Sequence, residues 1–227
     1  MADTDSLAAS RYSLSAQVRN HILSRIAVGD LAPGDRIVEA RVASELRVSS
    51  IPVREAIREL VAKRVLEYVV HKGARVREVS MAETVDALQV KAVLEALAAR
   101  LAGVRLAECT TRLRECIKPM RGLLIRHDFV RFQDQNQSFH RAIMESSGNP
   151  ILVTMWESLA FEVRTRFIMD HMKAVDPDQL TFEHESILRA IEAGDNEGVA
   201  DLLMTHSQHL IEGLKSQIAA SAVSGEA

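Results

Sequence analysis

A four-residue polar segment between two amphipathic stretches constrains this fold more than any other feature of the sequence. Apolar residues recur at helical spacing over about 37–46 and again over 51–61, and only Arg47–Ser50 separates the two stretches. A connection this short makes two helices pack closely at a steep angle, as in a helix-turn-helix. A further stretch with the same spacing, over 13–28, precedes them and ends at Gly29.

A β-hairpin is predicted directly after these helices. Leu66–Val70 is rich in β-branched residues, His71–Gly73 forms a tight turn and Ala74–Val76 returns. Three helices followed by a hairpin make a winged helix-turn-helix, whose last helix enters the major groove of DNA. The sequence therefore predicts a DNA-binding domain over 13–78, preceded by a flexible segment over 1–12.

Two arginines lie on the outer face of the last predicted helix. Arg54 and Arg58 are four residues apart, opposite the apolar stripe. An arginine fork can bond O6 and N7 of one guanine, so these are the expected base readers. The alternative is that they pair with Glu55 and Glu59 on a solvated face.

The charge distribution agrees with DNA binding by the N-terminal part. Residues 1–78 hold 13 Lys and Arg against 10 Asp and Glu, whereas residues 79–227 hold 15 against 21. The predicted DNA contacts lie in the second helix, the turn, the third helix and the hairpin tip. In sequence order they are Arg41, Ser49, Ser50, Ile51, Arg54, Arg58, His71, Lys72 and Gly73.

The rest of the chain predicts an all-α bundle of about six helices over 79–218, so the fold class is mainly α. The chain has 10 Gly and 5 Pro, whereas average usage would give roughly 27 of the two together in a chain of this length. This scarcity of turn-forming residues favours long helices and few turns. The expected helices span 81–105, 108–125, 128–146, 150–172, 177–193 and 196–218. Ser80 and Glu83 predict a capping box at the start, and 219–227 is expected to be a flexible tail.

Histidines on three of these helices could together bind one metal ion. Asn136 and His140 are four residues apart and point the same way, while His184 and His206 lie on two further helices. Three imidazoles and one oxygen suit Zn, Ni, Cu or Fe. For each histidine alone, the alternative is a surface or a satisfied core position. The histidines without an evident partner are His21, His127, His171 and His209.

Composition and the N-terminal sequence argue against several classes of protein. One Trp, two Tyr and six Phe are too few for a platform that stacks single-stranded nucleic acid. Cys109 and Cys116 are two helical turns apart, about 10 Å between Cα atoms, which is too far for a disulfide. The N-terminus does not resemble a signal peptide, and no apolar run reaches about 18 residues. A cytoplasmic protein without a membrane span is expected.

The N-terminal motifs resemble those of GntR-type bacterial transcription regulators over roughly residues 10–78. The matching runs are Pro33–Glu39, Val42-Ala43 and Val48–Ile57. In that family Pro-Gly opens the second helix, and a V-S-R-x-P-V-R-E-A-L string covers the turn and the recognition helix. Arg54 matches the second Arg of this string, which resembles a base-reading residue of the family.

Two positions depart from the family's pattern. Ser50 stands where the family usually has Arg, and Arg47 stands where it often has Gly. Because the missing Arg is an expected DNA contact, the family's usual operator sequence is not expected here.

The C-terminal motifs resemble the FCD effector domain of the FadR branch of these regulators, over about 80–218. The matching runs are Asn136–Ile143, Ser147–Pro150 and Glu183–Asp195, with His206 eleven residues beyond. The resemblance implies a divalent metal, Zn or Ni above all, whose shell a small carboxylate effector completes. The implied ligands are Asn136, His140, His184 and His206.

The FCD resemblance also implies effector contacts and shows a departure. Asn136 replaces the usual Asp, and because an amide is neutral we expect weaker metal binding. Lys91 stands near a family Arg that faces the effector, and Lys holds a carboxylate as a point charge rather than a fork. Arg164 on the fourth predicted helix of the bundle is a second candidate.

Together these patterns predict a ligand-responsive transcription regulator, in most cases a repressor, that binds a short palindromic operator as a homodimer. One alternative is a DNA-binding regulator whose bundle only dimerises. Another is a metal-dependent hydrolase, which would leave the N-terminal domain without a role. A hydrolase also needs a general base, and Glu183 and Glu185 point about 100° away from His184 on a helix.

Overall fold

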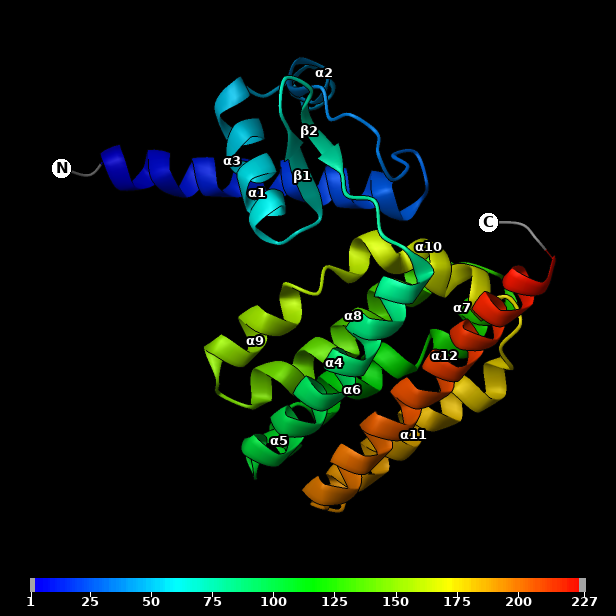
Figure 1. Ribbon diagram of the computed structural model, residues 1–227. Coiled ribbons are helices and arrows are strands. Elements are labelled where there is room, and N and C mark those ends of the chain that lie inside the picture. Colours follow the sequence, from blue (N-terminus) through cyan, green and yellow to red (C-terminus); the bar gives the residue numbers. More distant parts are fainter. Residues whose placement is uncertain (1–2, 225–227) are drawn as a thin grey trace. The chain divides into compact units, whose positions relative to one another are not determined.

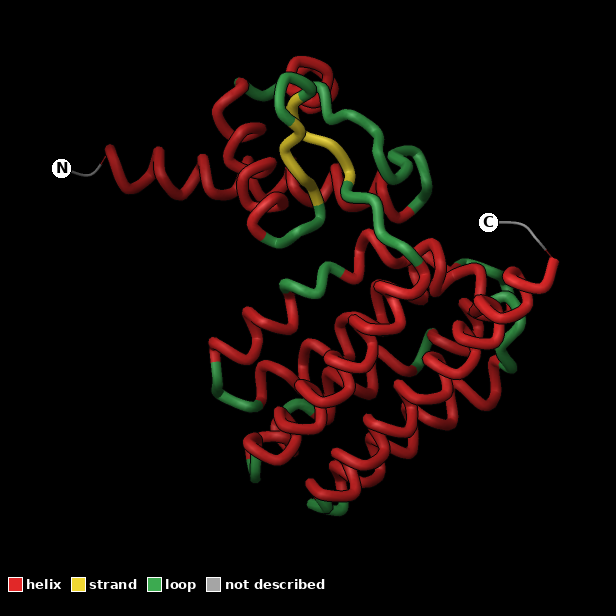
Figure 2. Tube along the Cα trace, in the orientation of Figure 1, coloured by secondary structure: helices red, strands yellow, loops and turns green. Residues whose placement is uncertain are grey.

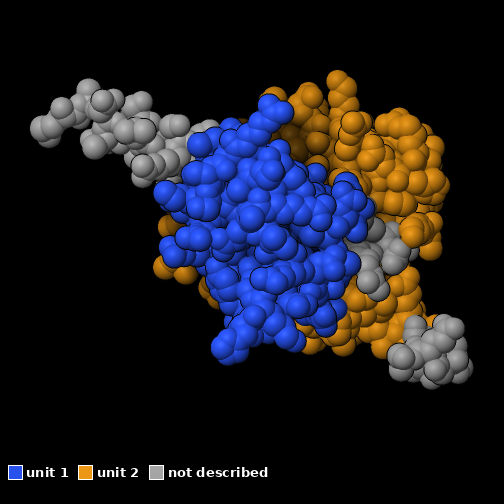
Figure 3. Space-filling model, turned by 90° about the horizontal axis from the view of Figure 1, so that it is seen from above, with its two compact units in different colours: residues 1–79, 158–164 blue, residues 80–157, 165–227 orange. Residues whose placement is uncertain are grey.

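The computed structural model describes residues 3–224, and the side chains of residues 14–220 apart from 162, 165, 166, 169 and 170. The chain forms two compact units, residues 1–79 with 158–164 and residues 80–157 with 165–227 (Figure 3). Among the described residues, the first unit contains helices and one hairpin, whereas the second contains helices alone (Figure 2).

The first unit is a winged helix-turn-helix, as predicted. Its elements are α1 (Asp3–Ala27), α2 (Glu39–Leu46), α3 (Ser50–Ala62), β1 (Leu66–Val69) and β2 (Gly73–Val76) (Figure 1). The strands are antiparallel, pairing Leu66 with Val76 and Val69 with Gly73. The turn between them places His71 at φ 61° and Gly73 at φ 81°, so the hairpin tip adopts the left-handed backbone that tight turns require.

The start of α1 differs from the expectation of a flexible segment over 1–12. The helix begins at Asp3 rather than at Ser13. The segment contains no Gly or Pro before Gly29, and Leu7, Ala8 and Ala9 are good helix formers. Helix propensity therefore carries α1 through the segment without a break.

The start of α3 differs slightly from the predicted cap. The helix begins at Ser50, and the capping position is Ser49, whose side chain makes no capping hydrogen bond. Pro52 lies in the first turn, where its missing N–H costs nothing. Arg47 ends α2 at φ 54°, a backbone conformation that favours glycine and agrees with the glycine common there in the GntR family.

The core of the first unit fixes which face of α3 is free. Val18 and Ile22 of α1 and Val53, Ile57 and Leu60 of α3 are all fully buried. Each such side chain contributes about 1.5–3 kcal/mol relative to exposure. Since these residues hold one face of α3 inside, the opposite face with Arg54 and Arg58 remains exposed.

The second unit is an all-α bundle. Its helices are α4 (Met81–Ala102), α5 (Arg105–Glu108), α6 (Thr110–Ile117), α7 (Met120–Ile125), α8 (Phe129–Ser146), α9 (Pro150–Glu157), α10 (Phe161–Met172), α11 (Pro177–Glu192) and α12 (Asn196–Ser224). The start of α10, as far as Arg164, belongs to the first unit. In the described residues α4 packs along α12 and against α8, and α11 packs against α12 (Figure 1). Ser80 caps α4 as predicted, because its Oγ accepts from the backbone N of Glu83 at 3.0 Å.

Three expectations for the bundle are corrected. The single helix expected over 108–125 is divided, because Pro119 cannot continue α6. The helix expected over 150–172 is divided into α9 and α10 at Ala160, which adopts φ 50°. The tail expected to be flexible over 219–227 is helical as far as Ser224, since its alanines and serines contain no breaker before Gly225.

The core of the bundle includes buried residues of α8, α11 and α12, which pack around α4 or one another. Phe139, Ile143, Ile187, Leu203 and Leu214 are fully buried there. Both cysteines are free thiols, as predicted. None of the helices between residues 3 and 224 is long and apolar enough to cross a membrane.

Candidate functional site

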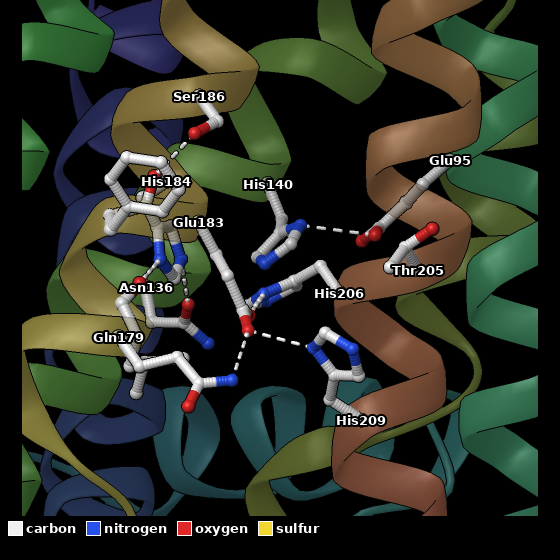
Figure 4. Close-up of polar contacts among 12 residues, drawn as sticks. Glu95, Asn136, His140, Gln179, Glu183, His184, Ser186, Thr205, His206 and His209 are labelled. Carbon is white, nitrogen blue, oxygen red and sulfur yellow. Dashed lines mark hydrogen bonds and ion pairs between the residues drawn. The ribbon is translucent and has the colours of Figure 1, made fainter.

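Three histidines from three different helices converge inside the bundle. His140 lies on α8, His184 on α11 and His206 on α12, and one ring nitrogen of each lies within 4.8 Å of the others (Figure 4). Their ring centroids are 4.6–5.9 Å apart. The structure therefore brings these three residues together, and their shared role as metal ligands remains a prediction.

His140 is buried and oriented by a carboxylate. Its side chain is 1% exposed, and its Nδ1 lies 3.0 Å from Oε2 of Glu95 on α4. The Nδ1–H donates to this carboxylate, so the lone pair is on Nε2. Among the described residues, Nε2 has no hydrogen-bond partner although it is buried. A buried acceptor without a partner is costly unless a ligand occupies it.

His184 is oriented by its own helix. Its Nδ1–H donates to the carbonyl oxygen of Leu180 at 2.8 Å, which again leaves the lone pair on Nε2. Nε2 lies 2.8 Å from Oδ1 of Asn136. With the amide in this orientation two acceptors face each other, an arrangement that a shared cation satisfies. With the amide turned over, its N–H donates to Nε2 instead.

His206 is oriented by a carboxylate that the sequence analysis did not assign to the site. Its Nδ1 lies 2.7 Å from Oε2 of Glu183, and Nδ1 of His209 lies 2.7 Å from the other oxygen. Glu183 thus contacts two histidines of α12 and fixes the ring of His206 with Nε2 turned away (Figure 4). Carboxylate–histidine pairs of this kind support metal ligands.

The two fully buried imidazoles are in the neutral form that binds metals. Burial lowers the pKa of His140 to about 4, although Glu95 acts in the opposite direction. Burial, together with His206 and His140, lowers the pKa of His184 well below its usual value. At neutral pH both rings therefore offer a lone pair rather than a positive charge.

Glu95 is a fully buried carboxylate with partners on both oxygens. Burial acts to raise its pKa, but His140 and the ammonium of Lys91 outweigh it and hold this pKa well below the usual range. Lys91 Nζ lies 2.7 Å from Oε2 of Glu95, and Nε1 of Trp156 donates to Oε1 at 2.8 Å. The buried ion pair between Lys91 and Glu95 therefore lies on the Nδ1 side of His140.

The donor set fits a divalent metal. Tetrahedral zinc binds imidazole nitrogens at about 2.0–2.1 Å, which places ligand nitrogens roughly 3.4 Å apart, so small side-chain movements close the set. Nε2 of His140, His184 and His206 and the amide oxygen of Asn136 would hold the ion. The orphaned Nε2 of His140 is the observation that supports this fit.

The two predicted effector contacts have different surroundings. Lys91 is buried beside the histidines, with Nζ 3.4 Å from Nδ1 of His140. Arg164 is 4% exposed, and its Nη1 donates to the carbonyl oxygens of Leu159 and Ala160. The geometry therefore associates Lys91 with the histidine cluster, and both roles remain predictions.

The predicted DNA contacts lie on the surface of the first unit. All of them are exposed except Gly73, which is half-buried; they are Arg41, Ser49, Ser50, Ile51, Arg54, Arg58, His71, Lys72 and Gly73. Among the described residues, neither Arg54 nor Arg58 forms an ion pair with Glu55 or Glu59. Arg54 pairs with Glu39 of α2, and Glu59 pairs with Arg19 and Lys63.

One cation near the hairpin was not predicted from sequence. Arg36 is exposed and its guanidinium lies beside Gly73, where an added Cβ would be 3.7 Å from Nε. Arg36 also forms an isolated antiparallel bridge with Arg75 of β2. The Arg36 side chain thus adds a positive charge next to His71 and Lys72.

Comparison with known proteins identifies both units. Residues 14–76 match the model of the bacterial regulatory proteins of the gntR family, and residues 86–209 match the FCD domain. The chain belongs to the GntR family and carries an FCD domain. A relative described as a probable D-xylose utilization operon transcriptional repressor, from Paenarthrobacter nicotinovorans, is 33% identical over 90% of this chain and 89% of its own length.

Further relatives agree with this assignment. The gluconate operon transcriptional repressor of Bacillus licheniformis is 27% identical over 88% of this GntR protein and 82% of its own length. The solved structure of McbR/YncC from Escherichia coli matches with a TM-score of 0.74 and 28% identity, over 90% of this chain and 98% of that one. The family and these relatives are transcription regulators rather than enzymes, so the chain is a ligand-responsive DNA-binding regulator.

Proposed function

We propose that this GntR regulator is a repressor that binds a palindromic operator as a homodimer and releases it when a small carboxylate effector binds at a divalent metal. The convergence of His140, His184 and His206 carries the metal and effector part of the proposal. If the effector causes release, linkage requires that it bind the DNA-bound protein more weakly than the free protein.

The metal would be Zn or Ni, held by Asn136, His140, His184 and His206. When bound, it supplies positive charge that attracts a carboxylate. Asn136 is neutral, so the site has less negative charge than one with Asp, and an anionic effector would offset the charge of the ion. The relative named for a gluconate operon makes hydroxy acids a sensible first class of compounds to test.

The DNA-binding surface would use α3 and the hairpin. Arg54 and Arg58 are exposed on one face of α3, which suits base reading in the major groove. Lys72 and His71 at the hairpin tip suit phosphate contacts. Arg41 on α2, together with Ser49, Ser50 and Ile51 where the turn leads into α3, would make further contacts with the DNA.

An apolar stripe on α4 supports the homodimer. Val90, Val93, Leu97 and Leu101 recur at helical spacing, and each is 41–56% exposed. Such a stripe on a helix whose other face is buried is a candidate interface. A second copy is the occupant proposed, since the same stripe on both subunits makes a self-complementary twofold contact.

A thermal-shift matrix on the chelator-stripped protein tests the metal and effector together. Zn²⁺ and Ni²⁺ form one axis, and small mono-, di- and hydroxycarboxylates form the other. A ligand at 100 times its Kd stabilises by about 2.7 kcal/mol, which raises Tm by a few degrees. We expect a metal shift that one class of acid increases; a flat matrix would contradict the sensor site.

A further inference from the structure

The geometry points to Glu39 as a positioning residue that holds the guanidinium of Arg54 in the orientation for base reading. Oε2 of Glu39 accepts from Nε of Arg54 at 2.8 Å. The contact joins the first residue of α2 to the first turns of α3. This inference rests on the proposed base-reading role of Arg54.

The contact with Glu39 uses only the Nε side of the Arg54 guanidinium. Glu39 engages Nε, and among the described residues Arg54 has no other hydrogen bond or ion pair, although Tyr68 lies near enough to act on it electrostatically. The Nη1 and Nη2 edge therefore stays available for O6 and N7 of guanine. A flexible arginine loses side-chain freedom when it binds a base, and a partner already in place reduces that loss. The Arg54 side chain is 59% exposed, so most of it is accessible to a partner.

The position of Glu39 at the start of α2 favours its contact with Arg54. Glu39 is in the first turn of α2, where the helix dipole stabilises a negative charge. The pairing raises the pKa of Arg54, mainly through the hydrogen bond to Glu39. An exposed pair like this adds little to folding stability, so its value lies in orientation.

The alternative is that Glu39 only keeps Arg54 away from DNA. The two roles predict opposite results when the carboxylate is removed. In either role, a carboxylate lost near the DNA surface strengthens binding to any sequence, because repulsion from phosphates decreases. The ratio of specific to non-specific affinity separates the two roles. If Glu39 positions Arg54, removing the carboxylate lowers this ratio, and if Glu39 keeps Arg54 away from DNA, removing it raises the ratio.

The experiment uses the full-length protein and a duplex that the wild type selects from a random-sequence library. Kd values for this duplex and for an unrelated duplex are compared for Glu39→Ala, Glu39→Gln and the control Glu67→Ala. Glu67 is an exposed glutamate on β1, and among the described residues it forms no ion pair. Melting temperatures within a few degrees of wild type establish that each variant folds.

We expect Glu39→Ala to lower the affinity ratio about two- to tenfold, and to relax base preference at the position that Arg54→Ala relaxes. Glu39→Gln should recover part of the loss, because its amide oxygen can still accept, and Glu67→Ala should leave the ratio unchanged. An unchanged or increased ratio for Glu39→Ala would overturn the inference. If Arg54→Ala itself leaves the preference unchanged, the proposed base reading fails as well.

Discussion

The two candidate sites of this protein are built in opposite ways. The proposed DNA contacts all lie between Arg41 and Gly73, on neighbouring elements, and all but Gly73 are exposed. The proposed metal ligands run from Asn136 to His206 on α8, α11 and α12. They meet only because the bundle folds, with α4 packed against α8 and α12 and with α11 packed against α12. Substitutions at the surface site should therefore change affinity at little cost to folding, whereas substitutions at the buried site act on ligand and stability together.

The sharpest test of this contrast is His184→Ala. Its Nε2 is one of three converging donors, so the variant should lose Zn²⁺ binding altogether, a decrease well beyond the 10- to 100-fold typical of outer-shell changes. A competition titration against a chromophoric chelator measures this. His209→Ala is the control, because His209 is half exposed and, among the described residues, its contact with the cluster is the ion pair with Glu183. Unchanged Zn²⁺ content in His184→Ala would show that the ligand set is wrong.

The same contrast explains what the sequence could predict. The helix-turn-helix and hairpin follow from local patterns, whereas the partner of Arg54, fifteen residues away in Glu39, does not. The four proposed metal ligands follow from spacing and resemblance. The two carboxylates that orient the imidazoles, Glu95 and Glu183, do not follow from the sequence. Helical spacing does not show that Glu95 contacts His140, 45 residues along the chain, or that Glu183 contacts His206.

Helix boundaries show a similar limit. Pro119 was a visible signal for the break between α6 and α7, since proline cannot continue a helix. The break at Ala160 has no such signal, because alanine favours a helix and adopts φ 50° there only in the folded structure. Tertiary packing rather than local sequence must set this second boundary.

The second test concerns the stripe on α4. Leu97→Glu would bury two like charges across a twofold interface, which costs about 3–5 kcal/mol and weakens dimerisation roughly 100-fold or more. Analytical ultracentrifugation measures the result. Phe182→Glu is the matched control, because Phe182 is an exposed apolar residue on α11. A Leu97→Glu protein that stays dimeric would place the interface elsewhere.

A smaller effect is expected at the DNA surface. Arg54→Ala should cost about 1–3 kcal/mol on the selected duplex and relax preference at one base position, because a bidentate base contact is lost. Lys72→Ala should weaken all sequences alike and reduce the salt slope by about one. Binding titrations at several salt concentrations measure both. Equal effects of the two variants on sequence preference would contradict the division of roles.

The smallest change is expected from Asn136→Asp. A carboxylate attracts a dication more strongly than an amide, so Zn²⁺ affinity should rise about tenfold, or 1.4 kcal/mol. Gln137→Glu makes the same charge change at the next residue of α8 and should have little effect. Isothermal titration calorimetry compares the two. A loss of affinity in Asn136→Asp would indicate that residue 136 is not a ligand.

The central claim is that a ligand at the three histidines controls DNA binding by the other unit. The direct measurement is the affinity of the full-length protein for the selected duplex in chelator, in Zn²⁺, and in Zn²⁺ with the acid that gives the largest thermal shift. We predict that the acid weakens wild-type binding about 5- to 150-fold and leaves His184→Ala unchanged. Equal affinities under all conditions, or the same change in His184→Ala, would contradict this account.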